Sequence, residues 1–153
     1  MDDLEREALL GVDVEKLQLT QRQALVWALR AQGLSQVQIA RRWGTSRANI
    51  CNLERVAREH IEASRHTIAF DEQLRAPLHL VCHPGELLFD IPPKLYRSAD
   101  ASDIKVKYDG PMVVQHLLSE APECVKDNRL TRPLLLMVSL EGQLYVRALT
   151  PSA

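Results

Sequence analysis

The chain has 153 residues, of which 46% are hydrophobic and 25% charged, with a formal net charge of -1 at pH 7. This composition is typical of a globular protein with one domain or two small ones, and it excludes a disordered or fibrous chain. The longest apolar stretch, Leu134 to Val138, is far shorter than the roughly 20 residues of a membrane span. The acidic amino end does not resemble a secretory signal and the three cysteines are widely spaced, so we expect a cytoplasmic protein without disulfides.

Positive charge is concentrated in one block of the chain. Residues 20–66 carry eight arginines and three acidic side chains, whereas residues 1–19 and 67–153 are both net acidic. Arginine binds phosphate groups and guanine edges through paired hydrogen bonds. A nucleic-acid-binding surface is therefore expected in the central block, with a plain solvated helical surface as the alternative.

Two helices with clear start and stop signals are predicted first. Thr20 and Gln23 form a capping box that opens a helix ended by Gly33. A second capping box at Ser35 to Gln38 opens a short helix that stops at Gly44. Val37, Ile39, Ala40 and Trp43 of this short helix are expected to face the core.

A third helix is predicted to begin near Ser46, with Thr45 as its cap. No glycine or proline interrupts it before Pro77, so it extends to about Leu74 and is long enough to connect domains or to form a dimer. Its inward positions are Ile50, Leu53, Ala57 and Ile61.

The second and third helices match a helix-turn-helix. Ala40 is small enough for the two helices to approach each other, and Gly44 permits the tight turn. The two helices are expected to cross with the side chains of Ile39, Ile50 and Leu53 wedged between them. The pattern predicts sequence-specific binding of double-stranded DNA, with the third helix in the major groove.

The outward side of the third helix is polar. Asn52 suits adenine, Arg47 or Arg55 suits guanine, and Ala48 suits a thymine methyl group. The helix start, with Thr45 and Ser46, suits a phosphate. The complete predicted DNA-binding set is Thr45, Ser46, Arg47, Ala48, Asn49, Cys51, Asn52 and Arg55, with Arg41 and Arg42 of the second helix as phosphate contacts.

After Pro77 the pattern changes to that of a small α+β domain. The predicted elements are a strand at Leu78–Cys82, a turn at 83–85, a helix at Lys94–Ala101, a strand at Ile104–Tyr108, a helix at Met112–Ser119, and a hairpin of 133–140 with 143–149 around Glu141-Gly142. The fold class is thus α+β, with an all-α helix-turn-helix domain before a small α+β domain that ends in a β-hairpin. We predict an acidic segment at 1–18, a DNA-binding domain with an extended third helix at 19–76, and a dimerisation or effector domain at 77–153.

Two stretches resemble a known family. The run LTQRQALVWALRAQGLSQVQIARRWGTSRANICNLERVAREHIEASRHTI resembles the amino-terminal domain of the archaeal Tfx DNA-binding proteins, and DIPPKLYRSADASDIKV resembles their carboxy-terminal domain. The resemblance covers Leu19 to about Val106. It implies a sequence-specific transcription regulator with a helix-turn-helix and a small α+β partner domain. Cys51 stands where a small polar residue such as serine is expected.

Two other functions are open alternatives. A protein-interaction module that docks on the transcription machinery predicts binding that is nearly insensitive to salt. A metal or ligand sensor centred on Cys82, beside His79 and His83, is disfavoured because these residues match no known ligand spacing. We predict no enzyme activity, no cofactor and no metal. The expected partners are double-stranded DNA, a second copy of the chain in a homodimer and, as an open alternative, a small-molecule effector.

Overall fold

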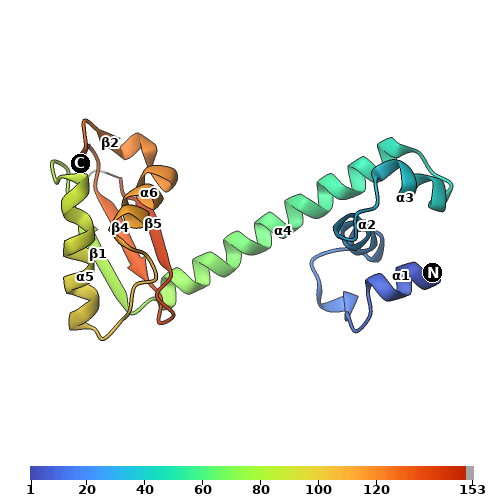
Figure 1. Cartoon of the computed structure of the whole chain (residues 1–153), viewed down its shortest axis with the longest axis horizontal. Coiled ribbons are helices and arrows are strands. Elements are labelled where there is room, and N and C mark those ends of the chain that lie inside the picture. The colour runs from blue at the N-terminus through green and yellow to red at the C-terminus, as the bar shows by residue number, and fades with distance from the viewer. Residues whose placement is uncertain (151–153) are drawn as a thin grey trace. The chain divides into compact units, whose positions relative to one another are not determined.

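A computed structural model describes residues 1–150 of the chain (Figure 1). It divides into two compact units, Met1–Ile68 and Ala69–Ala153. The first unit is helical and the second combines helices with a sheet, which confirms the predicted α+β class. No helix in the described part is both long and apolar enough to cross a membrane. The domain limits at residues 18 and 76 remain predictions.

The first unit confirms the three predicted helices. It contains α1 (Asp3–Ala8), the 3-10 turn η1 (Val14–Lys16), α2 (Gln21–Ala31), α3 (Gln36–Trp43) and most of α4 (Arg47–Arg75). Both predicted capping boxes are formed, at Thr20 and at Ser35. Gly44 has a φ of 60°, the left-handed conformation that ends α3 and turns the chain into α4.

Two local predictions in this unit are wrong. The cap of α4 is Ser46 rather than Thr45, because the Ser46 hydroxyl accepts a hydrogen bond from the backbone amide of Asn49 at 3.1 Å. Val37 does not face the core and is 40% exposed. Its neighbours Ile39 and Ala40 are buried, and they define the inner face of α3 without it.

The helix α1 was not predicted, although its start carries a sequence signal. Asp2 and Glu5 form a complete capping box, which is the same acidic-x-x-Glu spacing that the sequence shows. Leu4 and Ala8 of α1 pack against the core of the first unit. The acidic amino end is therefore a packed element of this unit.

The core of the first unit fixes which side of α4 faces outward. Its buried members come from α2, α3 and α4, and they are Val26, Leu29, Ile39, Ala40 and Ile50. Burying one such large apolar side chain stabilises the fold by about 1.5–3 kcal/mol, so rotation of α4 about its axis is strongly opposed. The helices α1, α2 and α3 gather around the amino-terminal part of α4 (Figure 1).

The second unit is built on a three-stranded antiparallel sheet in the order β1-β4-β5. Its elements are β1 (Leu78–Cys82), η2 (Leu88–Asp90), α5 (Ile91–Ala101), α6 (Gly110–Glu120), η3 (Pro122–Cys124), the small hairpin β2 (Val125–Lys126) and β3 (Arg129–Leu130), β4 (Leu134–Val138) and β5 (Leu144–Ala148). Alternate strand residues such as Leu134 and Leu136 are buried with Leu95 of α5 and Leu117 of α6 in one core. Both helices therefore cover the same face of the sheet.

One predicted strand is absent. Residues 104–108 form no strand, although Ile104, Val106 and Tyr108 contact the core as their alternation suggests. The backbone amide of Lys107 donates to the carbonyl of Gly142 at 3.0 Å, but no ladder of such bonds is formed in the described part of the chain. The alternation reflects packing on the core rather than pairing with a neighbouring strand.

The predicted carboxy-terminal hairpin is confirmed, with a longer turn than expected. The Ser139 amide donates to the Gln143 carbonyl at 3.0 Å and the Gly142 amide to the Ser139 carbonyl at 2.9 Å, so Leu140, Glu141 and Gly142 form the loop. Such loops place a residue with positive φ at their third position, which is the conformation of Gly142 at 87°.

Candidate nucleic-acid interface

The start of α4 presents a polar face to solvent. The predicted contact residues on this helix are all exposed, namely Arg47, Ala48, Asn49, Cys51, Asn52 and Arg55. On the opposite side, Ile50 and Ala57 have no exposed surface. The same apolar stripe that anchors α4 in the core thus keeps this polar set outside.

The turn before α4 is held by two hydrogen bonds that Asn49 donates. Asn49 donates from its backbone amide to Ser46 and from its side-chain Nδ2 to the Thr45 hydroxyl at 3.0 Å. Ser46 is exposed and Thr45 is half-buried. These contacts fix the first turn of α4, where backbone amides and the helix dipole favour an anion.

The exposed arginines of the helix-turn-helix differ in their partners. Arg55 donates to the Glu59 carboxylate at 2.6 Å and to the Asn52 side-chain oxygen at 2.8 Å. Within residues 1–150, Arg41 and Arg47 take part in no ion pair or side-chain hydrogen bond. These two guanidinium groups are thus available to phosphate without loss of an existing contact.

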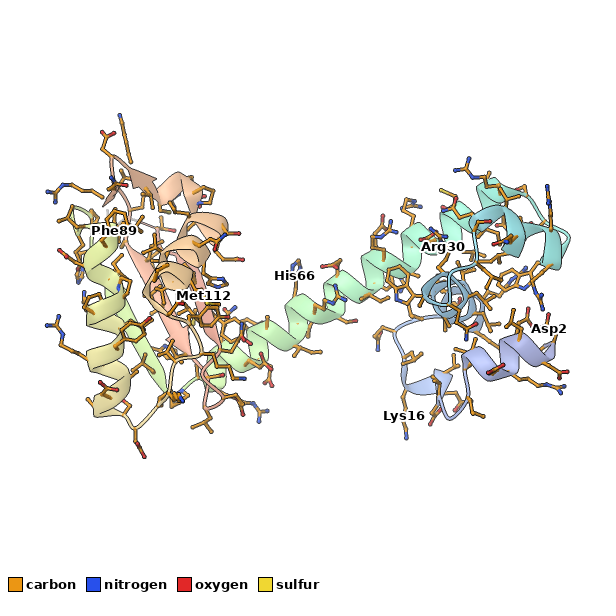
Figure 2. All side chains as sticks on the ribbon, viewed as in Figure 1. Asp2, Lys16, Arg30, His66, Phe89 and Met112 are labelled. Atoms are coloured by element: carbon orange, nitrogen blue, oxygen red, sulfur yellow. The ribbon has the colours of Figure 1, made fainter. Side chains whose placement is uncertain are left out.

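A buried carboxylate ties the three helices together. Glu54 of α4 accepts hydrogen bonds from Arg30 of α2 at 3.2 Å, from Gln36 of α3 at 2.7 Å and from Arg58 at 3.3 Å. Burial alone would raise the pKa of Glu54, but the hydrogen bonds from Gln36 and Arg30 outweigh it and hold the pKa below its usual value. This ionised group fixes the crossing of α3 and α4. Figure 2 labels Arg30.

The acidic helix α1 is joined to α3 by polar contacts. The Arg42 guanidinium donates to the Asp2 carboxylate at 2.5 Å, and the indole N–H of Trp43 donates to Glu5. The backbone hydrogen bond from Glu5 and the bond from Arg42 lower the pKa of Asp2. Arg42 is therefore less free for DNA than its neighbour Arg41. The guanidinium group of Arg22, from α2, lies over the Trp43 ring, 5.1 Å from the ring centre.

The structure offers no support for a metal sensor at Cys82. In the described range 1–150 no three side chains of His, Cys, Asp or Glu gather as metal ligands do. Cys82 is fully buried in β1, and burial raises the pKa of its thiol to about 11. A thiol binds metal or attacks a substrate as the thiolate, which this environment disfavours.

Sequence reasoning identified the exposed face but not the polar contacts behind it. The bonds of Glu54 to Arg30 and of Arg42 to Asp2 join residues far apart in the chain. No local pattern marks such pairs. The one available signal was the charge segregation, because an acidic segment precedes an arginine-rich block.

Comparisons with known proteins bear on the whole chain. The model of the family described as DNA-binding protein TFX, carboxy-terminal part, matches residues 64–146. A protein of Haloarcula marismortui, whose name assigns it as a transcriptional regulatory protein, is 35% identical over 147 residues, which are 96% of this chain and 92% of that protein. A protein of Thermococcus kodakarensis with the same kind of name is 38% identical over 128 residues, or 84% of this chain and 83% of its own. The DNA-binding protein Tfx of Methanothermobacter thermautotrophicus is 38% identical over 95 residues, which are 62% of this chain and 69% of that protein.

Proposed function

This chain belongs to the Tfx family of archaeal DNA-binding proteins, and we propose that it is a transcription regulator that reads the major groove of double-stranded DNA with the start of α4. The observation that carries the proposal is the exposed polar face of α4, opposite its buried stripe, in a helix-turn-helix with a tight turn at Gly44. A recognition helix needs this combination of a fixed inner side and polar groups outside.

The proposed contacts divide into those that read bases and those that hold the backbone. Asn52 lies about one turn into α4 and Arg55 about two turns, and they carry groups that pair with adenine and guanine edges. Arg47 is an unpaired alternative for guanine. The remaining set contacts phosphates or base edges near the helix start: Thr45, Ser46, Ala48, Asn49, Cys51, Arg41 and Arg42. Each good bidentate contact contributes about 1–3 kcal/mol of discrimination between bases.

The existing bond of Arg55 to Glu59 does not oppose this role strongly. Both side chains are more than half exposed, at 56% and 59%. Exposed ion pairs of this kind stabilise by about 0–1 kcal/mol, which is less than one bidentate contact to guanine. DNA can therefore displace Glu59 from Arg55 with a net gain.

Selection of bound sites from a random duplex pool at physiological salt tests the proposal. Arg55→Ala is expected to lower affinity for the selected site by roughly tenfold and to relax preference at one base position. Arg65→Ala is the matched control, since Arg65 is an exposed arginine farther along α4 that pairs with Glu62. Sequence preference that survives Arg55→Ala unchanged would refute the groove assignment.

Salt dependence separates this function from docking on a protein. Contacts to several phosphates release counterions, so affinity for DNA falls steeply as salt is raised. Binding that barely changes between about 50 and 200 mM salt would favour the protein-interaction alternative.

We also propose that the chain acts as a homodimer. The support is three exposed apolar side chains on α4 beyond the DNA-binding part, because Ile68, Phe70 and Leu74 are 59%, 54% and 62% exposed. Two copies would present two recognition helices, as paired half-sites require. Light scattering is expected to give twice the chain mass, and Ile68→Glu is expected to give a monomer. A monomeric parent protein would remove this part of the proposal.

A further inference from the structure

A pocket with an almost wholly apolar lining lies between α5 and α6 in the second unit. Its volume is about 530 Å³, within the range of sites that hold small molecules. Three prolines, Pro92, Pro93 and Pro111, and the side chains of Phe89, Tyr96, Val114 and Leu118 form most of its wall. Figure 2 labels Phe89, just before α5 begins. We propose that this pocket binds an uncharged, mostly apolar small molecule that carries aromatic or aliphatic rings, a function that is independent of the proposed reading of DNA.

The lining favours an uncharged ligand. No lining residue carries a charge, so nothing in the wall compensates the desolvation of an ion. Helix starts often bind anions through free backbone amides, and both α5 and α6 begin at this pocket. Here Pro92, Pro93 and Pro111 have no amide hydrogen, and Asp109 caps α6 by accepting the Met112 amide at 2.9 Å.

The polar groups of the wall are few. The Tyr96 hydroxyl donates to the backbone carbonyl of Tyr108 at 2.7 Å, so Tyr96 offers the pocket mainly its ring. Gln115 is the one lining side chain with an amide, and it is exposed. The ligand is thus a mostly apolar molecule with at most one or two polar atoms, which Gln115 can meet at the rim.

The extent of the wall favours a small molecule over a peptide helix. From α5 the wall takes only Pro92, Pro93 and Tyr96, and from α6 only Gly110, Pro111, Val114, Gln115 and Leu118. A helix laid in a groove needs anchors along several turns of its partner, more than this short wall supplies. Two large apolar side chains of the lining are exposed, Phe89 at 62% and Leu118 at 43%. A ligand bound in the pocket would cover both.

Binding of a fluorescent probe to the full chain tests the proposal. The probe is N-phenyl-1-naphthylamine, an uncharged ring compound, and its comparison is 8-anilino-1-naphthalenesulfonate, which adds a negative charge to the same rings. We expect the uncharged probe to bind with one site per chain and about tenfold or more tighter than the anion.

Variants on α6 locate the site. Leu118→Glu places a charge in the wall and is expected to weaken probe binding by about tenfold or more. Met112→Glu is the matched control, because Met112 is 47% exposed on the same helix and is not part of the lining, and it is expected to leave binding unchanged. Val114→Phe fills space without adding charge and is expected to weaken binding as well, which covers the case that Leu118→Glu unfolds.

The proposal is overturned by equal binding of the two probes, by equal loss in Leu118→Glu and Met112→Glu, or by a stoichiometry of one probe per two chains. The last result would mean that the apolar wall is covered by a second copy of the chain. Failure of the uncharged probe to bind at all would also refute the site. None of these results bears on DNA binding, which is measured separately.

Discussion

Arg55 donates a hydrogen bond to Glu59, one turn along the exposed face of α4, and its second N–H group donates to Asn52. The two residues proposed to read bases are therefore already joined to each other. Glu59 holds this pair in place, but it also puts a negative charge beside a surface proposed to meet phosphates.

Removing that charge is expected to strengthen DNA binding. Glu59→Gln frees Arg55 from an exposed ion pair worth about 0–1 kcal/mol, so affinity is expected to rise by up to roughly fivefold. The gain shrinks at high salt, where exposed charges are screened. Fluorescence anisotropy with a labelled duplex measures it.

Glu62→Gln is the control for this variant. Glu62 pairs with Arg65 on the same helix, so its loss changes the net charge equally. If both variants bind DNA equally well, the gain comes from total charge and Glu59 has no special place in the site.

Protonation of Glu54 is expected to lower the stability of the first unit in acid. Because its pKa is lowered on folding, its contribution to stability is complete above the ordinary value of about 4.5 and is lost as the pH falls from there through the folded pKa. Glu54→Gln is expected to cost about 1–3 kcal/mol at pH 7, since Arg30 and Arg58 lose their ionised partner. The variant is also expected to lose less stability than the parent protein between about pH 5 and pH 3.

Tryptophan fluorescence during urea unfolding measures the stability of the first unit. Both tryptophans of the chain, Trp27 and Trp43, lie in the first unit. Glu86→Gln is the control, because Glu86 also has a lowered pKa and pairs with Lys94 at 2.9 Å, but it lies in the second unit. If Glu86→Gln changes the stability of the first unit as much as Glu54→Gln does, the contacts of Glu54 are not what stabilises that unit.

The helices α2, α3 and α4 could be predicted because their signals are local. The capping boxes of Thr20 and Ser35 and the turn at Gly44 depend on residues within one turn of the helix. From these limits and the apolar stripe, the exposed face with Asn52 and Arg55 followed. The shift of the cap from Thr45 to Ser46 is a one-residue difference between two hydroxyl side chains that suit the same position.

The features that could not be predicted depend on distant partners. Residues 104–108 alternate like a strand, but a strand also needs a neighbour, and here Lys107 meets Gly142 in a single bond. The short hairpin of β2 and β3 was missed although Asp127 and Asn128 both have positive φ, which suits these residues in a tight turn. The pocket between α5 and α6 arises from two helices that the sequence predicts separately.

Cysteine labelling offers a direct test of which face meets DNA. Cys51 is exposed beside the proposed reading residues, whereas Cys82 and Cys124 are buried, and burial raises the pKa of both buried thiols. Maleimide is therefore expected to modify Cys51 first in the native protein. Bound DNA is expected to slow that reaction, and the labelled protein is expected to bind DNA poorly. Mass spectrometry of peptides follows each site.

A cysteine elsewhere on α4 controls for general shielding. His66→Cys in a Cys51→Ser background places a thiol at an exposed position farther along the helix (Figure 2). DNA is expected to leave its labelling rate unchanged. Equal protection at both positions, or none at Cys51, would argue that the start of α4 does not enter the groove.

Two glycines of the second unit are expected to differ sharply in their tolerance of alanine. A Cβ atom at Gly142 would lie 2.1 Å from the carbonyl oxygen of Lys105, which is backbone and cannot move aside freely. A Cβ atom at Gly85 meets nothing within 4 Å, while both residues have a similar positive φ, of 87° and 90°. Gly85→Ala is therefore expected to lower the free energy of unfolding by only about 1–2 kcal/mol, the penalty for alanine in a left-handed conformation. Gly142→Ala is expected to lower it clearly more. Hydrogen exchange of the amides in β4 and β5 measures the difference, and equal protection in the two variants would show that residues 104–108 are not held against the hairpin turn.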